Sequence, residues 1–247
     1  MSHFGSADFL IEVAKGNVAG HSLENLVMRS KNIVSTGFTD IWGFSGNLVL
    51  PTAAETWQVR SISSDDTLLG AGARKVLITY LDDSYLLKTV IAELNGTTAV
   101  TLNTDHFRPR SVVVIDSDPA VRHNVGNIIV ETSGAVARGF IEETFSASQD
   151  TSYTVPADTT VFFLKQSPYW EKNEDGDIMG FLGIEATNTD ITGGIFPAYQ
   201  NTFDIEFIAP LRIEAKTDIR FRAQSTNATV PAFSFVHEFL VVENAFL

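Results

Sequence analysis

Cysteine is absent from all 247 residues of the sequence. Disulfide bonds, zinc sites built on thiolates and cysteine nucleophiles are therefore excluded. A chain of this length can bury a sizeable core without covalent cross-links, so the absence of cysteine leaves the cellular compartment open.

Basic residues are also scarce, with 17 Lys and Arg against 30 Asp and Glu and a formal net charge of −13. A field of this sign repels phosphate backbones, so we expect no broad nucleic-acid-binding surface. The same charge favours solubility and suits a basic protein partner or bound cations.

Long apolar runs are missing as well, and none reaches the length of a membrane span. The opening residues, MSHFGSADFLIEVAKG, lack a basic segment followed by an extended apolar one, so we expect no signal peptide. These features predict a protein that is made in the cytosol and does not contact a membrane.

The sequence motifs of common catalytic and cofactor sites are absent. There is no G-x-S-x-G elbow, no Walker loop, no H-E-x-x-H and no G-x-G-x-x-G after a strand. Gly70 and Gly72 join two β runs, which predicts a turn rather than a phosphate loop. None of the five histidines is spaced as a metal pair. We therefore predict no catalytic residue, no cofactor and no metal site.

The strongest pattern that is present is period-two alternation in the last third of the chain. Apolar and polar residues alternate over residues 203–207, 211–216 and 219–223. Such runs predict strands with one buried and one solvated face. From Trp57 onward further short runs are separated by turn signals such as Asn95-Gly96. The predicted fold is all-β, an antiparallel β-sandwich or jelly roll, either as one unit or as two consecutive sandwiches.

The first fifty residues differ from the rest, because turn residues are many and apolar groups are brief. A short helix is expected after Ser6 or Asp8, ending at Gly16. The remainder predicts an irregular arm, which either follows the protein's own surface or docks on a neighbouring subunit. The expected division is an arm at 1–50, a first β-sandwich at 51–148 and a second at 149–247.

Acidic clusters are candidates for ion or catalytic sites. Asn173, Asp175 and Asp177 resemble the start of a calcium loop, but Ile178 and Ile184 stand where the turn glycine and the closing glutamate belong. A solvated turn is favoured there, and ion binding by 173–177 stays open. The carboxylates of Glu142 and Glu143 point to opposite faces of a strand, and those of Glu206 and Glu214 are expected on a solvated face, so neither pair predicts glycoside hydrolysis.

Aromatic side chains are the candidates for contact with a glycan or a partner. Tyr169 and Trp170 stand beside a polar loop and would suit stacking on a sugar, with Trp42 and Trp57 as further candidates. The alternative is that they anchor loops over the edge of a core. His237 shares a strand face with Phe235 and Phe239, which favours hydrogen-bonded packing over a ligand role.

Several stretches resemble a known group of proteins. They are YTVPADTTVFFL (153–164), the block from 207 to 244, GNVAGHSLENLVMRSKN (16–32), TGFTDIW (36–42) and LNGTTAV (94–100). Together they are similar to virion structural proteins of tailed bacteriophages. The resemblance implies a non-enzymatic β-sandwich protein, assembled in the host cytoplasm, that binds the major capsid protein as a decoration, cement or vertex protein. It also implies a homo-oligomer, with a trimer favoured.

Two alternatives remain open. The chain could be a tail or fibre component that recognises a host-surface glycan through Tyr169 and Trp170, or an enzyme that cleaves a polysaccharide.

Overall fold

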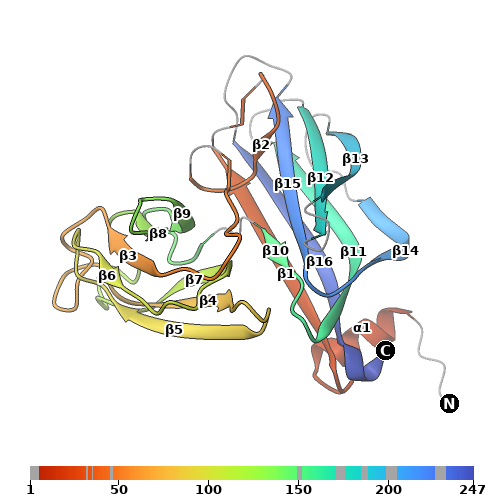
Figure 1. The fold of residues 1–247 in the computed structure, drawn as a ribbon, viewed down its shortest axis with the longest axis horizontal. Helices are drawn as coiled ribbons and strands as arrows, with labels where there is room; N and C mark the ends of the chain where they lie inside the picture. Colours follow the sequence, from red (N-terminus) through yellow and green to blue (C-terminus); the bar gives the residue numbers. More distant parts are fainter. Residues whose placement is uncertain are drawn as a thin grey trace.

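The structure is a computed structural model, and it describes residues 6–31, 33–34, 36–44, 47–148, 152–170, 176–184, 189–198, 205–225 and 232–247. Within these ranges the chain forms two units, which lie side by side in Figure 1. One unit contains both ends of the chain, and the other is built from its middle.

The larger unit consists of two antiparallel sheets. The first has the order β1-β16-β11-β14, and the second has the order β10-β15-β12-β13, with β2 also pairing with β15. The bounds are β1 His21–Ser30, β2 Thr39–Asp40, β10 Tyr153–Thr154, β11 Thr159–Trp170, β12 Gly176–Ile184, β13 Thr189–Ala198, β14 Ile205–Ile213, β15 Thr217–Ser225 and β16 Phe233–Glu243.

The strand order of this unit is that of a jelly roll. When β1, β2 and β11 to β16 are counted as first to eighth, one sheet holds the first, eighth, third and sixth strands. The other holds the second, seventh, fourth and fifth. Strands distant in sequence therefore alternate between two facing sheets, as two nested Greek keys require. The predicted all-β sandwich is confirmed.

The jelly-roll core comes from the alternation that the sequence shows. In β15 the residues Ile219, Phe221 and Ala223 are buried, and in β16 the odd-numbered residues from Phe233 to Val241 are buried. They meet Leu26 and Met28 from β1 and Phe163 from β11 in one cluster. The large aromatic side chains fill the space between the sheets.

The middle of the chain forms a second, smaller sandwich. One sheet has the order β6-β3-β8-β9 and the other has the order β5-β4-β7. A single apolar cluster, which includes Trp57, Ile78 and Val130, lies between them. The bounds are β3 Trp57–Ser61, β4 Ala73–Leu81, β5 Leu87–Glu93, β6 Val100–Thr101, β7 Arg108–Ser117, β8 Ile128–Thr132 and β9 Ala137–Ile141.

The irregular arm expected at 1–50 is corrected by the structure. After α1 (Ser6–Ala14), which matches the predicted short helix, β1 pairs with β16 along all ten of its residues. β2 joins the other sheet of the same unit. The small sandwich is thus inserted between the second and third strands of the jelly roll, rather than preceding it. The chain ends in a 3-10 turn, η2 (Asn244–Phe246).

No helix in the described part of the chain is long and apolar enough to cross a membrane.

Candidate interaction surfaces

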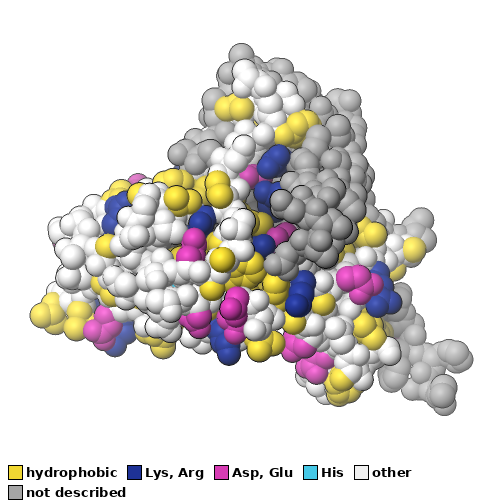
Figure 2. Space-filling view, viewed as in Figure 1, with side chains coloured by type: hydrophobic (Ala, Val, Ile, Leu, Met, Phe, Trp, Pro, Cys, Tyr) yellow, Lys and Arg dark blue, Asp and Glu magenta, His cyan; other side chains and the backbone are white. Residues whose placement is uncertain are grey.

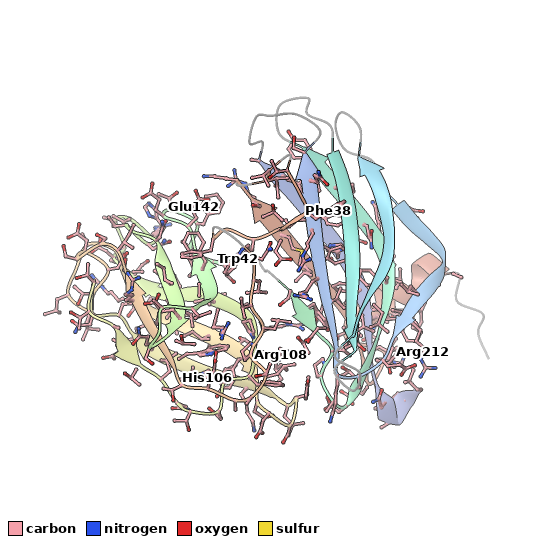
Figure 3. The ribbon with its side chains drawn as sticks, turned by 45° about the horizontal axis from the view of Figure 1, so that its top comes forward. Phe38, Trp42, His106, Arg108, Glu142 and Arg212 are labelled. Carbon is pink, nitrogen blue, oxygen red and sulfur yellow. The ribbon has the colours of Figure 1, made fainter. Side chains whose placement is uncertain are left out.

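Trp42 does not offer its ring to a glycan or a partner, because it is buried, with 2% of its surface exposed. It packs beside Phe44, at 5.5 Å between ring centroids, and belongs to a cluster with Leu48 and Phe140. In Figure 3 it lies on the segment that connects the two units. Trp42 therefore anchors this connection onto the inserted sandwich, which corrects its proposed role. Trp57 is buried as well.

Tyr169 is the candidate ring that the structure leaves in solvent, with 42% of its surface exposed near the end of β11. Trp170 pairs with Phe233 through the backbone, and its side chain lies outside the described residues. Residues 171–175 are also outside them, so the suggested ion loop at Asn173–Asp177 stays a prediction. Tyr169 alone of this group can be assigned to a surface.

His237 lies in the centre of the jelly roll. It is fully buried, its ring stacks on Phe221 at 3.9 Å between centroids, and Phe235 lies equally close. Both ring nitrogens lack a hydrogen-bond partner among the described residues, which corrects the expected hydrogen-bonded packing. Burial lowers the pKa of His237 well below its usual value, so the ring is neutral. It can neither reach a substrate nor shuttle a proton to solvent.

His106 is equally inaccessible, although it comes from a loop. Its ring lies between Trp57 and Tyr80, at 4.7 and 4.0 Å between centroids. Its Nδ1 lies 3.0 Å from the carbonyl oxygen of Asn103. Burial lowers the pKa of His106, and it raises the pKa of Tyr80 to about 12. The His106 ring thus packs against the core of the inserted sandwich, to which Trp57 and Tyr80 belong.

The candidate catalytic carboxylates Glu142, Glu206 and Glu214 make structural contacts or face solvent. Glu142 accepts hydrogen bonds from Arg29, at 3.3 Å, and from Lys31, and so links the two units. Glu206 and Glu214 are exposed on β14 and the turn after it. Across the described residues no three His, Asp or Glu side chains are grouped closely enough to hold a metal ion.

One carboxylate is buried at a loop junction of the inserted sandwich. Asp66 is fully buried and accepts hydrogen bonds from Ser61 Oγ at 2.5 Å and from the backbone N–H groups of Ala73, Val125 and Gly126 at 2.8–2.9 Å. These donors come from the end of β3, the start of β4 and the loop before β8. The acid is therefore held in place as a structural acceptor.

A buried ion pair joins the two units. The guanidinium of Arg108, on β7, donates to both carboxylate oxygens of Asp218, on β15, at 2.9 and 3.0 Å. Thr154 Oγ donates to the same carboxylate at 2.6 Å, and Arg108 also donates to the carbonyl of Pro51. Figure 3 shows Arg108 between the units. Because the ion pair is bidentate and buried, it restricts the orientation of one unit on the other.

Apolar and cation–π contacts surround this joint. Phe107 lies beneath the Arg108 guanidinium at 3.9 Å, and Tyr85 packs edge-on against Phe107. Arg110 lies 3.8 Å above the ring of Tyr153 and pairs with Glu24 of β1. Figure 2 shows charged side chains of both signs among hydrophobic ones where the units meet.

An open groove of about 520 Å³ lies beside the joint. Its walls come from the start of β1, the start of β5 and the end of β16, and Tyr153 and Arg110 lie among its lining residues. Burial raises the pKa of Tyr153 to about 12, so its hydroxyl stays protonated. The groove is lined by polar side chains such as Ser22 and Lys88 and by the apolar side chains of Leu86, Leu87 and Val241.

No protein family and no curated protein matches the sequence. Among solved structures, the chain is similar to the VP2 subviral particle of infectious bursal disease virus, with 13% identity, a TM-score of 0.25 and coverage of 96% of this chain and 78% of that one. It is also similar to the Gt strain of that virus (11%, TM-score 0.22, 92% and 73%) and to its derived T=1 particles (11%, TM-score 0.23, 96% and 76%). At TM-scores this low the likeness carries no argument about function.

Proposed function

We propose that this chain is a non-enzymatic structural protein of a tailed-phage virion. It binds the capsid surface as a decoration, cement or vertex protein, and its partner is the major capsid protein. It acts as a homo-oligomer and is assembled into particles in the host cytoplasm.

The observation that supports this proposal is where the structure brings the resembling stretches together. Residues 16–32 contain β1, residues 36–42 contain β2, and residues 153–164 contain β10 and the start of β11. The block 207–244 runs from β14 through β16. These four segments, far apart in sequence, all belong to the one jelly roll, whose architecture is common in viral capsid subunits. The fifth resembling stretch, 94–100, lies in the inserted sandwich.

Attachment has to use surfaces that are already folded. Because β1 and β2 are integral strands, the chain has no free arm at residues 21–30 that could exchange onto a capsid subunit. Among the described residues, the groove beside the Arg108–Asp218 joint is one surface that could serve this role. Burial of such surface against capsid subunits, with a polar rim, would supply the binding energy.

The direct test is to purify intact particles that carry this chain and determine their structure by electron microscopy. We expect density for both the jelly roll and the inserted sandwich on the capsid surface, at a constant ratio to the major capsid protein. Absence of the chain from purified particles by mass spectrometry, while it is present in the lysate, would contradict the proposal.

A second candidate function is recognition of a host-surface glycan by a tail or fibre component, because Tyr169 presents an exposed ring. Tyr169→Ala should then abolish binding on a glycan array with the fold unchanged. Phe246→Ala is the matched control, since Phe246 is exposed to a similar extent at 50% but lies at the chain end. Equal binding by both variants would leave only the capsid role.

Enzymatic activity is tested separately. We expect no release of reducing ends when the full chain is incubated with host surface polysaccharide, because His106, His237 and Asp66 are all buried. Steady production of reducing ends would overturn the non-enzymatic assignment.

A further inference from the structure

The groove beside the joint has walls from both units. The jelly roll contributes the start of β1, the turn before β11 and the end of β16, and the inserted sandwich contributes residues 86–88 and Arg110. Leu86 and Leu87, which are 42% and 57% exposed, form its apolar part on the inserted sandwich. Binding sites occur preferentially at interfaces between domains, and this groove lies at one.

Both Lys and Arg side chains that line the groove are already paired with a carboxylate. Arg110 forms an ion pair with Glu24 and lies over the ring of Tyr153. Lys88 lies 3.6 Å from Asp82. Neither cation therefore leaves an uncompensated positive charge in the groove.

Two other lining carboxylates have no cation beside them. Asp158 and Glu243 are exposed, and neither carboxylate forms an ion pair or a hydrogen bond within the described part of the chain. Thr159 pairs in register with Glu243, and the N–H of Asn244 donates to the carbonyl of Asp158 at 2.8 Å. The two acidic residues are therefore neighbours, beside the start of β11 and at the end of β16.

The remaining charged groups near the groove do not reverse this balance. His21 lines the groove, and its Nδ1 lies 2.8 Å from the carbonyl oxygen of Ala19. Lys216 does not line it, and its Nζ lies 5.3 Å from the centroid of the Tyr85 ring. Asp83 is exposed in the turn before β5 and adds a further negative charge. The uncompensated charge of the groove is thus negative.

We propose that this groove binds a cationic segment of a partner protein, one that carries both apolar side chains and lysine or arginine. Its cations pair with Asp158 and Glu243, and its apolar side chains contact Leu86 and Leu87. The net charge of −13 attracts such a segment and repels an acidic one. The groove volume of about 520 Å³ suits a short stretch of chain rather than a whole domain.

This inference does not depend on attachment to a capsid, because the charges and walls of the groove belong to the isolated chain. It also gives a place on the molecule to the basic partner that the acidic composition suits.

Fluorescence anisotropy of a labelled peptide of alternating leucine and lysine, titrated with the full chain, tests the inference. We expect saturable binding that weakens as salt is added, because exposed ion pairs are screened. A peptide of alternating leucine and glutamate should not bind. The double variant Asp158→Asn, Glu243→Gln should bind the lysine peptide about tenfold more weakly, since two exposed ion pairs are lost.

The double variant Asp65→Asn, Glu143→Gln is the matched control. It removes the same two negative charges from exposed positions of the inserted sandwich that do not line the groove, so it should bind the peptide as the wild type does. Leu87→Ala should also weaken binding, whereas Leu69→Ala should not, because Leu69 is 94% exposed but does not line the groove. Circular dichroism of each variant verifies that the fold is retained.

Equal weakening in the two double variants would show that the peptide responds only to net charge, and the assignment to the groove would be wrong. Absence of saturable binding, or equal binding of the glutamate peptide, also overturns it.

A second copy of this chain is the competing occupant. If the wild type self-associates in sedimentation velocity and Asp158→Asn, Glu243→Gln is monomeric, the groove belongs to that contact and the inference is wrong. If the peptide binds as expected but the chain is absent from purified particles, the inference stands and the proposed function fails.

Discussion

At the scale of single residues, the core of the jelly roll contains a polar group that packing alone does not require. Phe163, Phe221, Phe235 and Phe239 surround the ring of His237. They leave its two nitrogens without a partner among the described residues. The only cause of its lowered pKa is burial, since no charged group contributes. A neutral imidazole is therefore tolerated there, and an imidazolium is not.

This arrangement predicts a dependence of stability on acid pH. Below pH about 6.5 the histidine of the unfolded chain binds a proton, and that of the folded chain does not. The unfolded state then holds more protons, so the free energy of unfolding decreases as pH falls, by about 1.4 kcal/mol per pH unit from this group. The free energy of unfolding of His237→Phe minus that of the wild type should therefore be about 2 kcal/mol larger at pH 5 than at pH 7.

Urea denaturation of both proteins at several pH values measures this difference. Carboxylates contribute equally to both chains, so only the difference between the chains reports on His237. Parallel stability curves between pH 7 and pH 5 would show that the group titrates normally in the folded state.

The sequence predicted the face of His237 but not its surroundings. Alternation in β16 places residue 237 with Phe235 and Phe239, and the structure confirms this. Phe163 and Phe221 come from strands about seventy-five and sixteen residues away, and their proximity depends on which strands pair and face each other. Spacing in one strand carries no information on that pairing.

At the scale of elements, β1 is a strand that the sequence pattern did not predict. Its inward residues Leu26 and Met28 are buried, but Glu24 and Asn25 near its start interrupt the alternation. Ladder bonds to β16 along its whole length, rather than its own pattern, specify the strand. Tertiary pairing overrides a weak local signal in this way whenever a strand is half solvated.

Substitution at Met28 tests whether β1 is essential. Met28 is fully buried in the core, so Met28→Ala should reduce the free energy of unfolding by about 2–5 kcal/mol. Val27 is adjacent but 41% exposed, and Val27→Ala should change it by less than about 1 kcal/mol. Thermal or urea unfolding measures both, and equal small effects would restore the idea of a dispensable arm.

At the scale of the whole molecule, the insertion is the feature that sequence reasoning could not place. The strands β3 to β9 lie within residues 51–148, where a first sandwich was expected. The jelly roll begins before these strands and resumes after them, because β1 pairs with β16. This pairing joins residues more than two hundred positions apart. The all-β class was predictable from alternation, and the nesting was not.

The two linking segments, the Arg108–Asp218 pair and the ion pairs of Glu142 with Arg29 and Lys31 and of Arg110 with Glu24 hold the inserted sandwich in place. The Arg108–Asp218 pair is the most buried of these ion pairs. Arg108→Ala leaves the carboxylate of Asp218 buried without its cation, and breaking one partner of a buried pair costs about 3–5 kcal/mol. We expect the wild type to unfold in one calorimetric transition and Arg108→Ala in two, because weaker coupling lets the sandwiches unfold separately.

Arg60→Ala is the control for this last experiment, since Arg60 pairs with the buried Glu131 at 2.8 Å entirely within the inserted sandwich. Arg60→Ala should destabilise the inserted sandwich and leave the Arg108–Asp218 joint intact. We therefore expect this variant to keep a single transition. The double variant Arg108→Met, Asp218→Leu removes both charges and should recover most of the lost stability. A single unchanged transition in Arg108→Ala would mean that the remaining contacts, the apolar ones of Tyr85 and Phe107 and the ion pairs of Glu142 and Arg110, join the units without Arg108.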